Sequence, residues 1–284
     1  MRSSEVRCEL PAAATIAHQV AICLAEDMGG GDLTAELISA DAISKVEVIC
    51  REHAVLCGCA WFDEVFHQLD RNIRIEWLVT EGARVTAGTL LCRLDGNTRA
   101  LLSGERTALN YLQTLSATAT RSRCYADAVA GTGVRILDTR KTIPGLRLQQ
   151  KYAVTCGGCD NHRIGLYDAI LIKENHIQAA GSIAAALQAA QAVGGNVEIE
   201  IEVESLADLA QALAAGARRV LLDNFSLEQL SEAVALNAGR ARLEASGGVS
   251  LASIRRIAET GVDDISVGAL TKDITAVDLS MRFV

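Results

Sequence analysis

The chain has 284 residues, of which 50% are hydrophobic and 22% are charged, and it contains two prolines. This length fits one large α/β domain with a smaller companion, and the scarcity of proline leaves no room for a long disordered segment. The net charge of −8 argues against a nucleic-acid or acidic-membrane partner, because such partners require a basic surface. No apolar run approaches the ~18 residues that span a bilayer, and the first residues lack the apolar stretch of a secretory signal. We therefore expect a cytoplasmic protein that binds neither nucleic acid nor membrane.

The nine cysteines follow no framework spacing, which predicts reduced, buried thiols rather than disulfides. Cys156, Cys159 and His162 imitate the spacing of zinc ligands, but no second Cys/His pair with suitable spacing follows. The glycines between these residues fit a substrate-binding loop, so we favour that interpretation over a metal site.

The first hundred residues favour an antiparallel β-rich domain flanked by helices. Stretch 81–96 has the rhythm of a biotinyl or lipoyl carrier, but it has no lysine at the tip of a hairpin that could be modified. A helix that begins near Ser103 is expected to link this domain to the next one. The expected strands are VEVIC (46–50), AVLCG (54–58), IRIEWLV (73–79) and LLCRLDG (90–96).

From Val134 onward, short β-branched runs alternate with Ala/Leu-rich amphipathic stretches, which is typical of repeated βα units and a parallel sheet. Three of the helices are expected to begin with a capping serine, at Ser182, Ser205 and Ser250. Six such units favour a TIM-like barrel with fewer than eight strands, and a doubly wound open sheet remains the alternative. The runs are VRIL (134–137), AILI (169–172), VEIEIEV (197–203), RVLL (219–222), RLEA (242–245) and DISV (264–267).

Polar, charged or glycine residues occupy the end of every one of these predicted strands. In TIM barrels the functional residues lie at the carboxyl ends of the strands, so these residues are candidates for an active site. They are Asp138, Thr139, Arg140 and Lys141; Lys173, Glu174, Asn175 and His176; Glu202; Asp223 and Asn224; Ser246, Gly247 and Gly248; and Gly268.

The strand VEIEIEV alternates acidic and aliphatic residues. If its aliphatic residues face the helices, Glu200 and Glu202 point into the barrel, where an unpaired carboxylate is costly. Lys141, Lys173, Arg140 or a bound magnesium ion are the expected partners. The alternative is a half-exposed strand with one solvated acidic face.

A basic cluster follows the first barrel strand of this acidic chain. Such a cluster is the expected binding site of a small, multiply anionic ligand, because the fork of arginine binds two oxygens at once. The alternative is a set of solvated surface cations. The loop SGG (246–248), which precedes an expected helix, offers backbone amides to a phosphate, although such loops are common. The cluster comprises Arg140, Lys141, Arg147, Lys151, Arg163 and Lys173, with His162 among them.

Motifs along nearly the whole chain resemble those of the quinolinate phosphoribosyltransferases. The most specific are DTRKT (138–142) and the NHR triplet (161–163), and the family pattern departs only at Cys159, where a third glycine is usual, and at SATAT (116–120). The others are EDMGGGDLT (26–34), GERTALNYLQTLSATAT (104–120), KENHI (173–177), EIEVE (200–204), LLDNF (221–225), LEASGGV (243–249) and TGVDDISVGALTKD (260–273).

This resemblance implies an α/β fold with two domains. The first would be an N-terminal β-rich α/β sandwich at residues 1–110, and the second an incomplete TIM-like α/β barrel at 111–274. The C-terminal tail, 275–284, is expected to pack back on the N-terminal domain. The implied reaction transfers phosphoribosyl from phosphoribosyl pyrophosphate to quinolinate with decarboxylation, in NAD biosynthesis.

The resemblance also implies roles for individual residues. Glu202 and Asp223 match acids that face the ribose and a Mg²⁺ cofactor, and Lys141 is the candidate proton donor, since Arg140 and Arg163 beside it would favour loss of its proton. Arg106 would complete the site of the other subunit in a homodimer. The dicarboxylate pocket would comprise Arg140, His162, Arg163 and Lys173 with Lys141 and Thr139 nearby, and the phosphate loops Ser246, Gly247, Gly248, Val267, Gly268 and Ala269.

Three other functions remain open. A paralogue associated with molybdenum transport shares the DTRKT motif, but the complete KENHI and LEASGG motifs favour the biosynthetic enzyme. A nicotinate phosphoribosyltransferase needs to bind only one substrate carboxylate, and the larger number of cations in this chain favours a substrate with two carboxylates. A non-catalytic barrel that binds phosphorylated sugars would need the loops but not the arginines.

Overall fold

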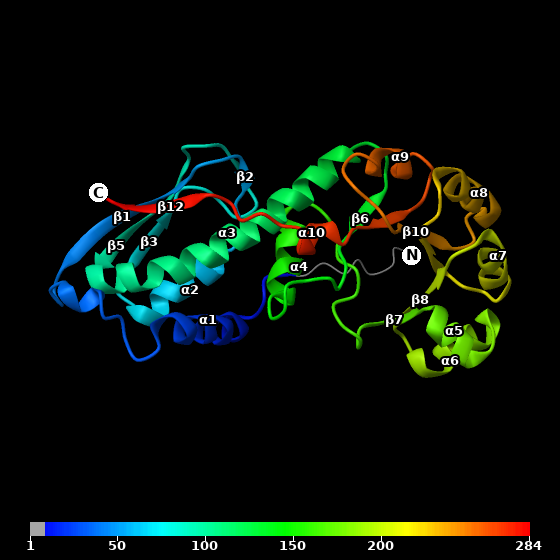
Figure 1. Ribbon diagram of the computed structural model, residues 1–284, viewed down its shortest axis with the longest axis horizontal. Coiled ribbons are helices and arrows are strands. Elements are labelled where there is room, and N and C mark those ends of the chain that lie inside the picture. The colour runs from blue at the N-terminus through cyan, green and yellow to red at the C-terminus, as the bar shows by residue number, and fades with distance from the viewer. Residues whose placement is uncertain (1–8) are drawn as a thin grey trace. The chain divides into compact units, whose positions relative to one another are not determined.

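The computed structural model describes residues 9–284 and divides them into two compact units. We call residues 9–123, 148–158 and 274–284 the sandwich unit, and residues 124–147 and 159–273 the barrel unit. Figure 1 shows the strands and helices of both. None of the helices in the described part of the chain is long and apolar enough to cross a membrane.

The sandwich unit contains the expected antiparallel sheet, with strand order β12-β1-β5-β3. Strand β12 from the end of the chain pairs with β1, where Val48 lies opposite Met281. The expectation that the AVLCG stretch forms a strand of this sheet is wrong. Only two of its residues form a strand, and they pair in a separate ribbon. The four strands are β1 (Ile43–Cys50), β3 (Arg74–Trp77), β5 (Leu90–Asn97) and β12 (Leu279–Phe283), and the ribbon pairs β2 (Ala54–Val55) with β4 (Arg84–Val85).

Helices line this sheet, and their aromatic side chains form its core. Phe62 packs edge-on against Trp77 of β3 with ring centroids 5.3 Å apart, and both Trp61 and Phe62 are fully buried. The long helix α3 begins at Thr98, earlier than the expected start near Ser103, because Asn97 caps it by accepting a hydrogen bond from the amide of Ala100. The helices are α1 (Ala13–Met28), α2 (Cys59–Leu69), α3 (Thr98–Ala128) and α4 (Arg147–Cys156), with a 3₁₀ turn at Ala35–Leu37.

The barrel unit holds six parallel strands in the order β6-β11-β10-β9-β8-β7. The first strand therefore pairs with the last, as closure of a barrel requires, and no pairing joins β6 to β7 within the described residues. This order confirms the incomplete barrel over the doubly wound sheet. The strands are β6 (Arg135–Leu137), β7 (Ala169–Ile172), β8 (Glu198–Val203), β9 (Arg219–Asp223), β10 (Arg242–Ser246) and β11 (Asp264–Ser266).

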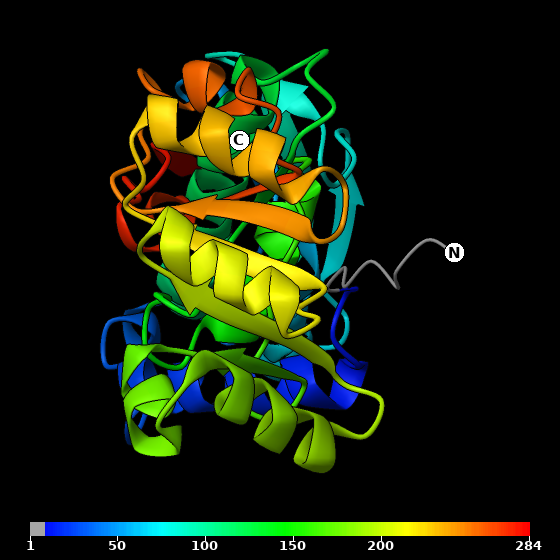
Figure 2. The same ribbon diagram turned by 90° about the vertical axis from the view of Figure 1, so that its right-hand side faces the viewer.

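The barrel helices between residues 183 and 258 lie on one side of the strands, as the colours from yellow-green to orange show in Figure 2. From β7 to β11, each strand lies beside the one before it, always in the same direction across the sheet. Because connections between parallel strands share one handedness, the helices in these connections lie on the same face of the sheet. Ser182 and Ser205 cap their helices as predicted, by accepting hydrogen bonds from backbone amides. Ser250 does not, because the helix after it starts at Ile254. The helices are α5 (Glu174–Ala180), α6 (Ile183–Gly194), α7 (Leu206–Ala214), α8 (Leu227–Asn237), α9 (Ile254–Ala258) and α10 (Ala269–Lys272).

Candidate active site

The carboxyl ends of the barrel strands and the loops that follow them form a surface that we call the mouth. Neighbouring loops of the mouth touch in pairs. A Cβ placed on Gly268 after β11 would lie 3.1 Å from the Lys141 side chain after β6. A Cβ on Gly247 after β10 would lie 2.1 Å from the Asn224 side-chain oxygen after β9, so this close approach requires glycine. Residues distant in sequence thus meet at one end of the barrel.

Arg140 follows β6 at the mouth, and Arg163 lies in the loop that leads to β7, where its guanidinium donates a hydrogen bond to the carbonyl of Ala169 at 3.4 Å. Burial and the positive charge of Arg140 lower the pKa of Arg163, so the two guanidinium groups repel each other. The Nε atom of Arg140 is buried and finds no hydrogen-bond acceptor among the described residues. Two cations that repel each other, one of them with an unused buried donor, form a site suited to an anion.

Asp138, fully buried at the end of β6, holds the loop that carries this second arginine. Its carboxylate accepts hydrogen bonds from the side chain of Asn161 at 2.7 Å and from the backbone amide of His162 at 2.8 Å. Asp138, the acid of the DTRKT motif, therefore has a structural role, because it fixes the loop at Asn161 and His162. The sequence predicted that Asp138 lies at the strand end but not this role, because the role depends on the burial of the side chain and on partners distant in sequence.

The imidazole of His162 is held by protein groups on both sides. Its Nδ1 atom accepts a hydrogen bond from the backbone amide of Arg163 at 2.8 Å, and its Nε2 atom lies 2.8 Å from a carboxylate oxygen of Glu200. Burial lowers the pKa of His162, but the hydrogen bond to Glu200 and the charges of Glu244 and Glu200 outweigh it, so the pKa is raised. His162 thus links the buried carboxylates to the arginine beside it.

Glu200 points into the barrel as expected, but its cationic partner is one that the sequence analysis did not consider. Ile199 faces α6, and Glu200 accepts a hydrogen bond from Arg219 at 2.8 Å instead of pairing with Lys141, Lys173 or Arg140. Arg219 also donates to Glu244 at 2.5 Å. This arginine was overlooked because it lies at the start of β9, away from the mouth, yet its long side chain reaches the barrel interior.

Acidic and basic side chains nearly balance around Arg219. Its guanidinium faces Glu200, Glu244 and Asp264, of which Asp264 is also bound by Arg242 and Arg135. Burial and the charge of Glu200 raise the pKa of Glu244 to about 7, although His162 and Arg219 oppose the shift. Glu244 therefore gains or loses its proton near neutral pH.

Glu202 and Asp223 lie on the neighbouring strands β8 and β9, at their carboxyl ends. Glu202 forms an ion pair with Lys173, which is one of the cations that were expected as its partner. The carboxylate of Asp223 accepts a hydrogen bond from the side chain of Asn224, which has a left-handed backbone with φ 57°. Both acids offer the hard oxygen ligands that Mg²⁺ prefers, and Mg²⁺ commonly takes one or two protein carboxylates together with substrate phosphates.

The other candidate residues divide between the two units. The Oγ1 atom of Thr139 accepts a hydrogen bond from the backbone amide of Lys141. Lys151 lies in α4 of the sandwich unit and is fully buried, so it does not belong to the expected basic surface. Arg106 is exposed on α3, also in the sandwich unit. At the mouth, Ser246, Gly247 and Gly248 end β10, and Val267, Gly268 and Ala269 follow β11.

The expectation that the SGG loop opens directly into a helix requires correction. Because α9 begins only at Ile254 and is one turn long, an anion at Gly247 and Gly248 would meet loop amides rather than a helix N-terminus. Among the residues with zinc-like spacing, Cys156 lies near Cys57 and Glu81, and His162 lies near Glu200 and Glu244, so the substrate-binding loop favoured for this stretch stays a prediction.

A cavity of about 1310 Å³ opens at the opposite end of the barrel. Its walls come largely from the amino ends of β7, β8 and β9, and it reaches His162 and Arg163 through the gap between β6 and β7. The cavity thus lies beneath the mouth and shares two residues with it.

An incomplete α/β barrel whose mouth gathers arginines, a lysine and two carboxylates defines a barrel protein built for a multiply anionic ligand. The family comparison is more specific. The model of the quinolinate phosphoribosyl transferase N-terminal domain matches residues 32–116, and that of the C-terminal domain matches residues 117–282. The chain belongs to the quinolinate phosphoribosyl transferase family.

Individual relatives agree along nearly the full length. A probable nicotinate-nucleotide pyrophosphorylase (carboxylating) from Bacillus subtilis is 41% identical over 257 residues, covering 90% of this chain and 89% of its own. A mitochondrial quinolinate phosphoribosyltransferase (decarboxylating) from Nicotiana tabacum is 36% identical, covering 92% and 80%. The solved nicotinate-nucleotide pyrophosphorylase from Francisella tularensis is 46% identical with a TM-score of 0.95, covering 98% and 99%.

The buried cluster generates a prediction about pH. Unfolded Glu244 titrates near its ordinary value of 4.5, whereas folded Glu244 holds its proton up to about 7. Between these values the folded state binds more protons, so the free energy of unfolding should fall as pH rises, by at most about 1.4 kcal/mol per pH unit. Glu244→Gln should flatten this slope in denaturant titrations between pH 5 and 7. Glu232→Gln, on an exposed side chain of α8, is the control and should keep the slope. An unchanged slope in Glu244→Gln would show that the carboxyl is ionised throughout.

Proposed function

We propose that this protein transfers phosphoribosyl from phosphoribosyl pyrophosphate to quinolinate with decarboxylation, and so yields nicotinate mononucleotide, CO₂ and pyrophosphate. The observation that carries the proposal is the unused buried donor of Arg140, whose charge acts on Arg163, in a chain that belongs to this family. The reaction is a step of NAD synthesis. The cytoplasmic location expected from the sequence stays a prediction, which cell fractionation would test.

Quinolinate carries two adjacent carboxylates, and the cations of the mouth suit both. Arg140 and Arg163 repel each other in the protein alone, and a dicarboxylate between them would relieve that repulsion. His162 acts as a positioning residue in this scheme, because both its ring nitrogens already have protein partners and one of these partners is the backbone of Arg163. Lys173 supplies a further positive charge from the end of β7.

Departure of pyrophosphate builds positive charge on the ribose ring. Glu202 and Asp223 are the carboxylates that stabilise this charge electrostatically. Lys173 orients Glu202 by their ion pair. A Mg²⁺ cofactor would be held by Glu202 and Asp223 and would offset the negative charge of the leaving pyrophosphate. The loops at 246–248 and 267–269 offer backbone amides to the phosphates.

Decarboxylation follows from the charge of the product. Ribosylation makes the pyridine nitrogen cationic, so loss of the neighbouring carboxylate leaves a carbanion that this nitrogen stabilises. The carbanion then needs a proton. Lys141 is the proposed donor, since its backbone is fixed by Thr139 and Thr271 and its side chain packs against Gly268 within the mouth.

The proposal predicts that purified protein with phosphoribosyl pyrophosphate and Mg²⁺ converts quinolinate to nicotinate mononucleotide and does not use nicotinate. A site built to pair with two carboxylates rejects an analogue that leaves a buried cation unpaired. Product formation and released pyrophosphate are measured by chromatography and a coupled assay. Comparable turnover of both acids would favour a nicotinate-specific enzyme, and binding without turnover of either would favour a non-catalytic barrel.

Arg140→Lys should weaken quinolinate binding strongly although the charge is kept. Lysine lacks the planar fork, and losing one charge-assisted hydrogen bond costs about 1.5 to 3 kcal/mol, or about ten- to a hundredfold in KM. Arg256→Lys, on an exposed residue of α9, is the matched control and should behave as wild type. Steady-state kinetics at saturating phosphoribosyl pyrophosphate measure the effect. An unchanged KM and kcat in Arg140→Lys would show that this arginine does not contact the substrate.

We further propose a homodimer in which Arg106 completes the site of the neighbouring subunit. Arg106 is an exposed cation on a helix of the sandwich unit, whereas the other proposed cations belong to the barrel unit. An exposed arginine is available to the barrel of a second copy, and two-fold symmetry would then complete both sites.

Hybrid dimers test this arrangement. Inactive Arg106→Ala and Lys141→Ala chains, unfolded together and refolded as an equal mixture, should regain about one quarter of the wild-type activity, because half the dimers would be hybrids with one intact site. Each variant refolded alone is the control and should stay inactive. If differently tagged chains co-purify as hybrids but no activity returns, Arg106 acts within its own chain or not at all.

A further inference from the structure

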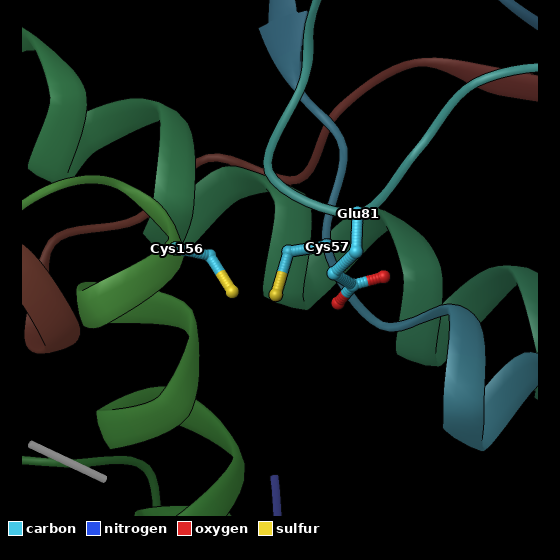
Figure 3. Close-up of side chains that lie close together, drawn as sticks. All are labelled: Cys57, Glu81 and Cys156. Carbon is cyan, nitrogen blue, oxygen red and sulfur yellow. The ribbon is translucent and has the colours of Figure 1, made fainter. Parts of the chain in front are cut away.

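A second cluster of reactive side chains lies in the sandwich unit. The sulfur atoms of Cys57 and Cys156 and a carboxylate oxygen of Glu81 all lie within 4.8 Å of one another. Figure 3 shows both thiols and the carboxylate turned toward a common centre. Cys57 is fully buried, whereas Glu81 and Cys156 are partly exposed, so the centre can be reached from solvent. The proposed reaction uses none of these three residues.

The backbone holds each thiol in place. The amide of Cys57 donates a hydrogen bond to the hydroxyl of Ser116 on α3, which in turn donates to the carbonyl of Cys57. Cys156 ends α4, and the next residue, Gly157, packs so closely on α3 that an added Cβ would lie 2.4 Å from the carbonyl oxygen of Ala119. The glycine after Cys156 therefore serves the packing that brings this thiol to Cys57.

The carboxylate is oriented as well. Glu81 accepts hydrogen bonds from the amides of Gly58 and Cys59 at the start of α2, at 2.8 and 3.1 Å. The thiols of Cys57 and Cys59 also hydrogen-bond to this carboxylate, and loss of the Cys57 proton would free a lone pair for a ligand. On the opposite side, Cys156 accepts hydrogen bonds from Cys57 and Tyr152, which lower the pKa of its thiol against the effect of burial. Backbone amides beside Glu81 and the side chain of Tyr152 thus orient the ligand atoms from outside the cluster, as such groups do around metal centres.

We infer that Cys57, Cys156 and Glu81 form a binding site for a thiophilic d¹⁰ cation, with Zn²⁺ as its representative. Two thiolates and one carboxylate are a donor set suited to tetrahedral Zn²⁺, and water from the exposed side supplies the fourth ligand. Mg²⁺ and Ca²⁺ prefer oxygen ligands throughout, so this site would discriminate against the cation proposed for the mouth. On binding, the two thiol protons leave for the solvent.

Cobalt provides a test that does not depend on catalysis. Co²⁺ added to the intact protein, kept reduced under argon with a phosphine, should bind at one ion per chain. It should produce a near-ultraviolet thiolate-to-cobalt band and the visible bands of a tetrahedral ion, and Zn²⁺ should abolish both. Cys57→Ser and Cys156→Ser should each lose the thiolate band, while Cys124→Ser, which removes an exposed thiol of α3, should retain it. Circular dichroism establishes that each variant is folded.

Alkylation of the wild-type chain covers the case in which a variant fails to fold. Zn²⁺ should slow the modification of Cys156 by iodoacetamide at least tenfold and leave Cys124 unchanged, as mapped by mass spectrometry. Absence of both the cobalt band and this protection, with thiol titration showing the cysteines reduced, would overturn the inference. So would a Cys57–Cys156 disulfide that persists under the reductant and excludes the metal. Neither result bears on quinolinate turnover, which the Mg²⁺ assay measures separately.

Discussion

A single buried guanidinium holds the interior of the barrel together. Arg219 on β9 faces Glu200 on β8, Glu244 on β10 and Asp264 on β11, so one side chain joins four adjacent strands. Asp264 extends the connection to Arg135 on the first strand. A buried ion pair costs desolvation and contributes little to stability by itself, but loss of one partner leaves an uncompensated charge. The network therefore makes this strand arrangement far more favourable than one in which any member loses its partner.

The same network reaches the mouth. Glu200 hydrogen-bonds to His162, and His162 accepts a hydrogen bond from the backbone amide of Arg163. The position of Arg163, which is proposed to bind the substrate, therefore depends on the ion pairs in the barrel interior. Asp138 fixes the loop from the other side. This arrangement explains how a chain of net charge −8 presents cations to an anionic substrate. Glu200, Glu244 and Asp264 are paired with Arg219 inside the barrel.

The two sets of candidate metal ligands differ in chemistry as well as in place. Glu202 and Asp223 at the barrel mouth are hard oxygen donors, whereas Cys57 and Cys156 in the sandwich unit are soft sulfur donors. Hard and soft donors select different cations, so the proposed sites would not compete for the same ion. The cysteine-and-glycine stretch 156–159 divides between the units, and its first cysteine belongs with Cys57 rather than with His162.

The sequence by itself predicted the six strands of the barrel, two of its serine-capped helices and the polar residues at the strand ends. The spacing of hydrophobic residues and the position of capping serines are local properties of the sequence. Ser182 and Ser205 cap helices α6 and α7 as predicted. It also determined the family, through motifs that run along most of the chain. Only the tertiary structure decided which charges pair. Arg219 and Asp138 gained their roles from burial and from partners distant in sequence, and Cys57 met Cys156 through packing on α3. Side-chain reach and burial depend on the assembled strands, and no local pattern encodes them.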